Sequence, residues 1–330
     1  MTSQLAPVTL AGIQRPVKDG LERVMAELGR IVRSDFPLIG DVNAHLLHLK
    51  GKLFRPTLLL LAARAVDRGA PRKVTLAAVV ELIHVATLVH DDSVDHSALR
   101  RGEPTVNARF SHQVAVIMGD YLYSRAIVQL VEMGDLDTLR VMSRVTNEMT
   151  VGEMRELEAH DALDYSEAAY RAMIRAKTAS LLSAACEVGA IDADDQRLRA
   201  ALRRYGLLLG MAFQITDDLL DYTGSEAVTG KPSGLDLREH KITLPLIAAL
   251  PRMTPGERRL VEELMAAPVP SDTMVAEVLA IVRDRGGAEA AAARAAGFAE
   301  QAEAELAAVP PGDARDALAD CITYAVERRT

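Results

Sequence analysis

The strongest constraint on this chain is an acidic pattern that occurs twice, each time at the end of an apolar segment. The two sets have the same spacing: Asp91, Asp92 and Asp95, then Asp217, Asp218 and Asp221. On a helix, residues four apart share a face, so the outer carboxylates of each set are neighbours. At about 6 Å and an effective dielectric near 20, two such charges repel by roughly 3 kcal/mol. The fold must therefore bring positive charge to both segments.

A divalent metal is the charge that this pattern predicts. Neither set has Lys or Arg four residues before its first carboxylate. Oxygen ligands suit Mg²⁺, which keeps several waters and is usually held by a few carboxylates plus substrate phosphates. One acidic cluster alone is more typical of a solvated helix end. Two with identical spacing, both at the polar ends of apolar segments, favour a Mg²⁺ site with all six carboxylates as candidate ligands.

Basic side chains near both acidic sets predict that the site also binds anions. They are Arg100 and Arg101, Lys52 and Arg55, and Lys231 and Lys241. Adjacent residues on a helix diverge by about 100°, so the first pair could serve two different anions. Pro56 disfavours helix at Arg55, which predicts a loop that leads into a helix, where backbone amides attract anions. Together these residues predict a site for two diphosphates.

Hydrophobic periodicity predicts an all-α fold. Apolar residues recur at helical spacing over 17–32, 56–66, 74–92, 112–132, 137–160, 166–190, 195–221 and 243–250. Gly, Pro and Asp interrupt these segments, and no alternating strand pattern is evident. The alanine-rich segment 284–307 predicts a helix on the outside of the fold. No linker divides the chain, so we expect one domain over residues 1–330, a large bundle of antiparallel helices.

Composition excludes several classes of protein. The formal net charge is -8 and the isoelectric point about 5.6, whereas nucleic-acid binders are usually basic. Cys186 and Cys321 lie far apart and are expected to be buried thiols in a reducing compartment. The first residues lack the pattern of a secretory signal, and no uninterrupted apolar run reaches the roughly 18 residues of a membrane span. We therefore expect a cytoplasmic protein without transmembrane segments or nucleic-acid partners.

An ordered set of motifs resembles the trans-isoprenyl diphosphate synthases of the polyprenyl synthetase family. The motifs are GKLFRP, ELIHVATLVHDDSVDHSALRRGEPT, GDYLYSRA, AKTASLL, FQITDDLLDYTG and GKPSGLDLREHKITLPL. The resemblance runs from about residue 50 to the C-terminus. It implies the isoprenoid synthase type of helical bundle around a central cavity. It also implies Mg²⁺-dependent condensation of isopentenyl diphosphate with an allylic diphosphate.

The resemblance implies a role for each matching residue. The diphosphate of isopentenyl diphosphate is assigned to Lys52, Arg55, His84 and Arg101. Metal binding on the two sides of the allylic diphosphate is assigned to Asp91, Asp92 and Asp95 and to Asp217, Asp218 and Asp221. Contacts to the allylic substrate or its leaving group are assigned to Arg100, Lys177, Thr178, Gln214, Lys231 and Lys241. The cationic residues and the metal ligands stabilise the departing diphosphate.

Three positions depart from the common pattern of the family. Lys50 replaces the first glycine of GGK, Glu156 replaces the glutamine of GExxQ, and His240 replaces the glycine of EGK. These changes concern local details of the pocket rather than the class of reaction. His90, which precedes the first acidic set, could be catalytic or structural.

Small residues before the first acidic set predict a long product. Thr87 lies one turn before Asp91 and Ala86 is adjacent to it, where short-chain members carry bulky aromatics that close the product tunnel. The floor of the tunnel then depends on deeper residues, such as Ile83 or the facing helix near Val116 and Met118. The motifs are most like those of longer-chain polyprenyl synthases, with geranylgeranyl or farnesyl diphosphate as the alternative product. Ala86 and Thr87 could also serve close packing alone.

Two other functions fit parts of the sequence. His84, His90 and Asp91 resemble the His-Asp pair of metal phosphohydrolases, which leaves the arginines and the second acidic set unexplained. The chain could also be an inactive subunit of a heteromeric synthase, although both acidic motifs are complete. The resemblance and the large apolar helices suggest a homodimer.

Overall fold

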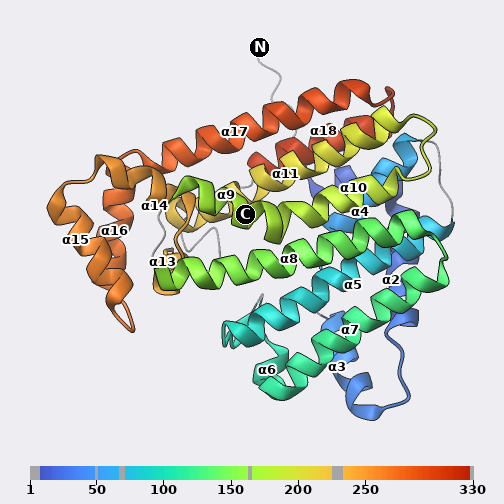
Figure 1. The fold of residues 1–330 in the computed structure, drawn as a ribbon, viewed down its shortest axis with the longest axis horizontal. Helices are drawn as coiled ribbons and strands as arrows, with labels where there is room; N and C mark the ends of the chain where they lie inside the picture. The colour runs from blue at the N-terminus through green and yellow to red at the C-terminus, as the bar shows by residue number, and fades with distance from the viewer. Residues whose placement is uncertain are drawn as a thin grey trace.

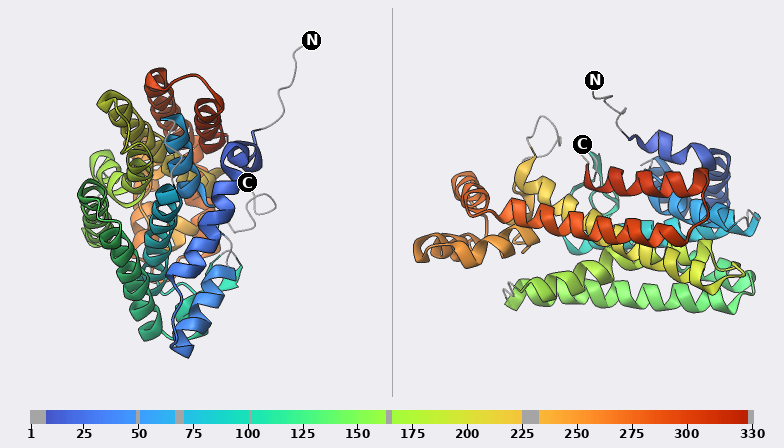
Figure 2. Two further views of the ribbon diagram at one scale, coloured as in Figure 1. Left: turned by 90° about the vertical axis from the view of Figure 1, so that its right-hand side faces the viewer. Right: turned by 90° about the horizontal axis from the view of Figure 1, so that it is seen from above.

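The computed structural model describes residues 8–48, 51–66, 71–100, 102–162, 166–224 and 233–327, and almost all of them are helical. The N-terminal third contains α1 (Leu10–Gln14), a 3-10 turn at Arg15–Val17, α2 (Lys18–Ile31), α3 (Pro37–His48), α4 (Phe54–Ala65) and α5 (Pro71–Val94). The middle third contains α6 (Val106–Arg109), α7 (His112–Glu132), α8 (Leu136–Ala162), α9 (Glu167–Ile174), α10 (Ser180–Gly189) and α11 (Gln196–Thr223). The long helices lie side by side in a bundle (Figures 1 and 2), which confirms the predicted fold class.

The C-terminal part adds helices both at one end of the bundle and along its length (Figure 1). They are α13 (Leu235–Arg238), α14 (Leu244–Ala249), α15 (Pro255–Ala266), α16 (Asp272–Asp284), α17 (Gly287–Glu305) and α18 (Asp313–Val326). The α15–α16 hairpin projects at the end where α13 and α14 lie (Figure 1). It has an apolar cluster of its own, which includes Leu237, Leu264 and Val278. α17 runs along the outside, as predicted, and buries a stripe of alanines.

The main core lies between the central helices because their apolar residues are nearly continuous. α4 buries nine of its twelve residues, from Phe54 to Ala63, which agrees with a helix that is surrounded on all sides. α10 buries nine of its ten residues. α5 lies between α4 and α7 and carries the first acidic set at its C-terminal end. The core thus fixes the position of that set.

Three local features differ from the sequence prediction. The predicted helix 166–190 is interrupted by a π-helical turn at Arg175–Ala179. A two-stranded antiparallel hairpin, Leu99–Arg100 with Glu103–Pro104, was not predicted. α4 begins at Phe54, after Leu53 in the left-handed conformation (φ 49°), so Arg55 is helical and the loop predicted there from Pro56 is wrong. Proline is tolerated in the first turn of a helix because its missing N–H would have no partner there.

Two helices are long and apolar enough to span a bilayer by length and composition, Arg72–Val94 and His112–Glu132. Polar side chains interrupt both helices, so neither contains an uninterrupted apolar run of the length that spans a membrane. The apolar window of α5 is 61% buried inside the protein, as expected for a core helix. That of α7 is only 39% buried, so α7 keeps an uncovered apolar side.

Candidate active site

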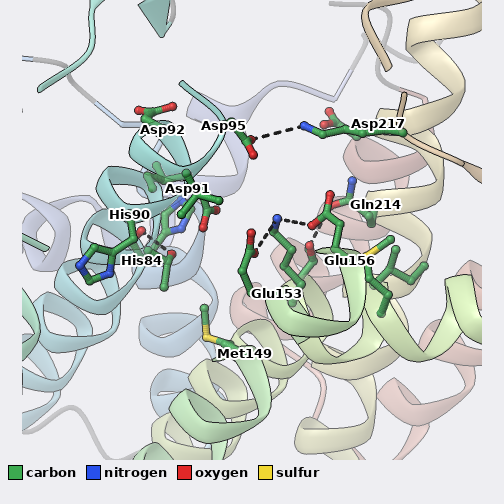
Figure 3. A pocket seen from close by; sticks show the side chains of 18 of the residues that line it. His84, His90, Asp91, Asp92, Asp95, Met149, Glu153, Glu156, Gln214 and Asp217 are labelled. Carbon is green, nitrogen blue, oxygen red and sulfur yellow. Dashed lines mark hydrogen bonds and ion pairs between the residues drawn. The ribbon is translucent and has the colours of Figure 1, made fainter. Parts of the chain in front are cut away.

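The two acidic sets face each other across one large cavity of about 1980 Å³. Asp91 points into it from α5, Asp95 from the residue directly after that helix, and Asp217 from α11 on the opposite side (Figure 3). Glu153 and Glu156 reach it from α8. The structure therefore brings together the two motifs that the sequence predicted to share a site.

Helix polarity makes both acidic sets electrostatically unfavourable. Asp91 and Asp92 lie in the last turn of α5, and the second set lies in the last turns of α11. Neither helix has a basic residue in its last turn. The C-terminus of a helix carries partial negative charge, so carboxylates are disfavoured there. This arrangement suits a site that binds cations.

The carboxyl group of Asp91 is also disfavoured as an anion by its burial and its acidic neighbours. Burial is the main cause that raises the pKa of Asp91, Lys177 opposes it, and Glu153, Glu156 and Asp95 add to it; together they bring the pKa to about 7. Near neutral pH this carboxyl group therefore binds protons readily. A divalent cation in the same position would relieve the same unfavourable field.

Asp92 is neutralised by an internal partner. Arg100 donates from Nε to both Asp92 oxygens at 2.9 and 2.8 Å, and its Nη2 lies 2.7 Å from Oδ1. Arg100 stands on the β-hairpin, which is fixed to the end of α5 because Thr105 Oγ1 and Asn107 Nδ2 both donate to the carbonyl of Ser97. The hairpin thus determines where Arg100 lies.

In the second set, Asp218 is buried in a chain of hydrogen bonds. Tyr170 donates its hydroxyl proton to Asp218 Oδ2 at 2.5 Å, and Gln214 Nε2 donates to Oδ1 at 2.7 Å. Thr178 Oγ1 in turn donates to Gln214 Oε1 at 2.8 Å. Burial raises the pKa of Asp218 to about 7, although the hydrogen bonds from Tyr170 and Gln214 lower it. Asp217 is therefore the more accessible carboxylate of the pair.

Asp221 caps the short helix α13. Its two carboxylate oxygens accept the backbone N–H groups of Leu235 and Asp236, each at 3.0 Å, and its carbonyl accepts that of Gly234 at 2.9 Å. A side chain that accepts such bonds positions the helix it caps. Asp221 thus connects α11 to the segment that carries Lys241, and its metal contact stays a prediction.

Lys177 is held at the cavity by two neighbouring carboxylates. Lys177 Nζ lies 2.7 Å from Glu153 and also contacts Glu156. Burial alone would lower the pKa of Lys177, but Glu156, Asp91 and Glu153 raise it above its ordinary value. Lys177 stands in the π-helical turn, a feature that often marks functional sites.

Lys241 closes the cavity from the other side. Its Nζ lies 3.5 Å from Asp95 and 2.8 Å from Glu239, so it connects the α13–α14 segment to the residue that follows α5. Burial would lower the pKa of Lys241, whereas Glu239 and Asp95 raise it above its ordinary value. Lys231 and Arg101 lie outside the described residues, and so does Lys50.

The residues assigned to the second diphosphate lie in the same cavity. Lys52, Arg55 and His84 all line it. Gln14 donates to the carbonyl of Lys52 at 2.9 Å, which fixes the loop before α4. Arg55 lies in the first turn of α4, where free backbone amides favour anions. The structure thus keeps a cationic pocket beside the two acidic sets.

Comparison with known proteins accounts for this combination of an all-α bundle and facing acidic sets. A sequence model described as Polyprenyl synthetase matches residues 36–282. The chain belongs to the polyprenyl synthetase family. It is therefore a prenyltransferase, and the phosphohydrolase alternative has no support. The motifs recognised in the sequence are confirmed as those of the family.

Relatives and solved structures resemble the whole chain. The chain is 39% identical to the all-trans-nonaprenyl-diphosphate synthase (geranyl-diphosphate specific) of Rhodobacter capsulatus, with 90% of this chain and 91% of the relative covered. It is 36% identical to heptaprenyl diphosphate synthase component 2 of Geobacillus stearothermophilus, with 94% and 97% covered. A polyprenyl synthase of Caulobacter crescentus, crystallised with calcium and isoprenyl diphosphate, superposes with a TM-score of 0.93 at 35% identity, with 99% and 100% covered.

In this polyprenyl synthetase, the cavity continues below the acidic sets. Ala86, Thr87 and Ile83 line it on α5, and Met149 lines it on α8. Thr87 Oγ1 donates to the carbonyl of His84 at 2.8 Å. Positions 86 and 87 carry small side chains that line the cavity, and their role in product length stays a prediction.

The predicted floor on the facing helix lies at other residues. Among the described residues, α7 lines the cavity with Asp120 and Tyr123 rather than with Val116 and Met118. Tyr123 donates its hydroxyl proton to Thr146 on α8 at 3.2 Å. The residues of α7 that line the cavity therefore lie about one helical turn after the residues predicted from the sequence.

His90 packs against α7. Its Nε2 lies 3.1 Å from the carbonyl oxygen of Val116 and 3.4 Å from Asp120. A Cβ atom on Gly119 would stand 2.2 Å from the same nitrogen, so the ring fits only because residue 119 is glycine. These contacts give His90 a structural role.

The sequence prediction missed three side chains of the site. Glu153, Tyr170 and Asp236 all line the cavity. Burial raises the pKa of Asp236 well above its ordinary value, and Asp218 and Asp221 add to this effect. Glu153 could have been found from its spacing, because it lies one turn before Glu156. Tyr170 and Asp236 stand outside the acidic motifs and become visible only in three dimensions.

Proposed function

We propose that this protein condenses isopentenyl diphosphate with an allylic diphosphate, head to tail, to an all-trans polyprenyl diphosphate longer than geranylgeranyl diphosphate. The observation that carries the proposal is the position of the two acidic sets. They face each other across a cavity (Figure 3) that Ala86 and Thr87 also line. Similar proteins are named as heptaprenyl and nonaprenyl diphosphate synthases, which supports a long prenyl product.

The site fits Mg²⁺ as the cofactor. Asp91, Asp95 and Asp217 supply oxygen ligands from two helix ends. No group of three or more acidic, His or Cys side chains among the described residues converges to hold a metal without other ligands. Mg²⁺ commonly completes its coordination with water and substrate phosphates. When bound, it would stabilise negative charge on the departing diphosphate.

Side chains of the protein would bind the two diphosphates and stabilise the developing charge. Lys52, Arg55 and His84 would hold the diphosphate of isopentenyl diphosphate. Arg100, Lys177 and Lys241 would bind the allylic diphosphate and stabilise the charge that develops as its C–O bond breaks. Lys231 and Arg101 are proposed for the same two diphosphates. Thr178 and Gln214 would position the second acidic set.

The lower cavity would protect the allylic cation from water. Ile83, Ala86 and Met149 give it an apolar lining at this level. The double bond of isopentenyl diphosphate attacks the cation, and a proton is then lost from the adduct. The released diphosphate is the proposed base. Exclusion of water at this step prevents hydrolysis of the cation.

Product analysis tests the proposal directly. The protein is incubated with Mg²⁺, radiolabelled isopentenyl diphosphate and farnesyl diphosphate, and the extracted products are separated by chain length. We expect prenyl products longer than geranylgeranyl. Geranylgeranyl alone would refute the proposed length, and phosphate release without chain growth would indicate a hydrolase. Activity that requires a second protein would indicate a component of a heteromeric enzyme.

We further propose a cytoplasmic homodimer. α7 leaves Ile117 and Val131 exposed at 64% and 60%. A second copy that covers this side of α7 would remove both from water, whereas single exposed apolar residues elsewhere are ordinary. Cys186 and Cys321 are buried free thiols, which suits a reducing compartment. Light scattering of the wild type and of Val131→Asp tests the dimer: we expect twice the monomer mass in the first and dissociation in the second.

A further inference from the structure

The segment that carries Lys241 has an unusual helix end. α13 ends in a Schellman arrangement, in which Lys241 N donates to the carbonyl of Asp236 at 2.7 Å and His240 N donates to that of Leu237 at 3.2 Å. In such an arrangement the residue that donates the second of these bonds is left-handed, and glycine is the usual choice there. Here it is His240, with φ 57°. A side chain at this position is strained unless it makes a contact that compensates.

His240 makes such a contact with the α15–α16 hairpin. Its Nε2 lies 2.8 Å from the carbonyl oxygen of Ala267, the residue that ends α15. The ring nitrogen donates this bond because the carbonyl can only accept. The bond joins the segment after α13 to a hairpin that lies away from the acidic sets.

The hairpin holds α13 at further points. Gly234, at the start of α13, has φ 79°, and a Cβ atom there would stand 2.5 Å from Val275 of α16. Leu237 is fully buried in the apolar cluster of the hairpin. Arg238 pairs with Asp272 at 2.7 Å, but Asp272 is 91% exposed, so this pair contributes little.

We propose that His240 is a positioning residue for Lys241, and that it acts by fixing the end of α13 to the α15–α16 hairpin. Residue 241 follows directly, and its ammonium group is held over the cavity beside Asp95. The proposal rests on the function proposed above, in which Lys241 binds the allylic diphosphate. Without the hydrogen bond to Ala267, the segment that carries Lys241 would be less ordered. The substrate would then have to order this segment on binding, which costs affinity.

Kinetics of four proteins test the proposal: wild type, His240→Gly, Lys241→Gln and the double variant. His240→Gly relieves the backbone strain, so its Tm should equal or exceed that of the wild type. Its KM for farnesyl diphosphate should rise about five-fold, which corresponds to ~1 kcal/mol, the net value of one hydrogen bond. Its KM for isopentenyl diphosphate should not change. In the Lys241→Gln background, the same substitution should have no further effect.

Two further variants and one direct measurement complete the experiment. His240→Asn tolerates the left-handed conformation, but its side chain is shorter than that of histidine, so it should behave as His240→Gly does. Asp272→Asn, which removes the exposed ion pair between α13 and the same hairpin, should behave as the wild type. Hydrogen exchange at residues 240–243, measured without metal or substrate, should be faster in His240→Gly.

Several results would overturn the proposal. They are an unchanged KM for farnesyl diphosphate in His240→Gly, an equal penalty in the Lys241→Gln background, or unchanged hydrogen exchange. A wild-type protein that does not extend farnesyl diphosphate would refute the proposed function instead. Hydrogen exchange would still report on the contact in that case, so the two failures can be told apart.

Discussion

The position of Asp91 predicts that its neutral isostere stabilises the metal-free protein. Burial raises the pKa of Asp91 from 3.8 to about 7, which corresponds to about 4 kcal/mol at 1.36 kcal/mol per unit. The side chain still contacts solvent at the cavity, so we expect screening to reduce this to about 2 kcal/mol. Asp91→Asn should therefore raise the free energy of unfolding by about 2 kcal/mol at pH 8 in the presence of a chelator.

The sign follows from proton linkage. The folded pKa lies above the unfolded value, so the folded state binds the proton more tightly. In the wild type, the stability that the protonated Asp91 contributes is fully present below pH 4 and is lost as the pH rises through 7. The advantage of Asp91→Asn should therefore fall to less than roughly half at pH 5. For a chain of 330 residues, ~2 kcal/mol corresponds to a Tm increase of about 3 °C at pH 8.

Thermal unfolding of the chelated protein at pH 5 and pH 8 measures both effects. Asp120→Asn is the matched control, because Asp120 lies at the same cavity but is 74% exposed, and its Tm should change by less than 1 °C. An added Mg²⁺–diphosphate mixture should stabilise the wild type more than Asp91→Asn. A lower Tm for Asp91→Asn at pH 8, or a difference that does not depend on pH, would refute the electrostatic reasoning.

Three further substitutions test the site. Asp217→Asn should lower kcat/KM at least 100-fold in the radiolabel assay, because it removes a group that stabilises charge in the transition state. Its Tm should change by only a few degrees, and activity retained per folded molecule would show that the second acidic set is structural. Thr87→Phe should shorten the product on chromatography, and an unchanged length would exclude this position from the tunnel wall. Tyr170→Phe removes a hydrogen bond that lowers the pKa of Asp218, so the acidic limb of the pH–rate profile should move up by up to about one unit. An unmoved limb would show that the ionisation of Asp218 does not control the rate.

Local periodicity was sufficient to predict the long helices. The predicted segment 112–132 coincides with α7, and 195–221 differs from α11 by one or two residues at each end. Both have helix-breaking or capping residues at their ends, such as Ser111, whose hydroxyl accepts the N–H of Val114. These features depend on near neighbours in the chain, so the sequence alone displays them.

Features that depend on packing were not predictable. The segment 166–190 has continuous helical character, yet a π-helical turn widens it at Lys177. That turn contacts α8 and α11, which are distant in the sequence. The β-hairpin of Arg100 has strands of only two residues, too short for an alternating pattern to be visible.

For the site, the sequence identified residue types but not their partners. Two carboxylates at equivalent positions of the two motifs take different roles, because Asp95 pairs with Lys241 whereas Asp221 caps α13. Asp218 is buried against Tyr170, which belongs to none of the acidic motifs. Such roles depend on which distant segment approaches each side chain. Spacing along one helix cannot show this.

The ion pairs of the substrate-free site have a consequence for substrate binding. Arg100 and Lys177, which are proposed to bind diphosphate, are each already paired with a carboxylate. A diphosphate alone would have to break these pairs and would leave the carboxylates without compensation. A divalent cation that accompanies it can take over those carboxylates, so that each charge exchanges one partner for another. We therefore expect diphosphate and metal to bind with strong positive coupling, and either one to bind weakly without the other. The same balance favours release: once the diphosphate leaves with its metal, the internal pairs form again and neutralise the charges that it exposes.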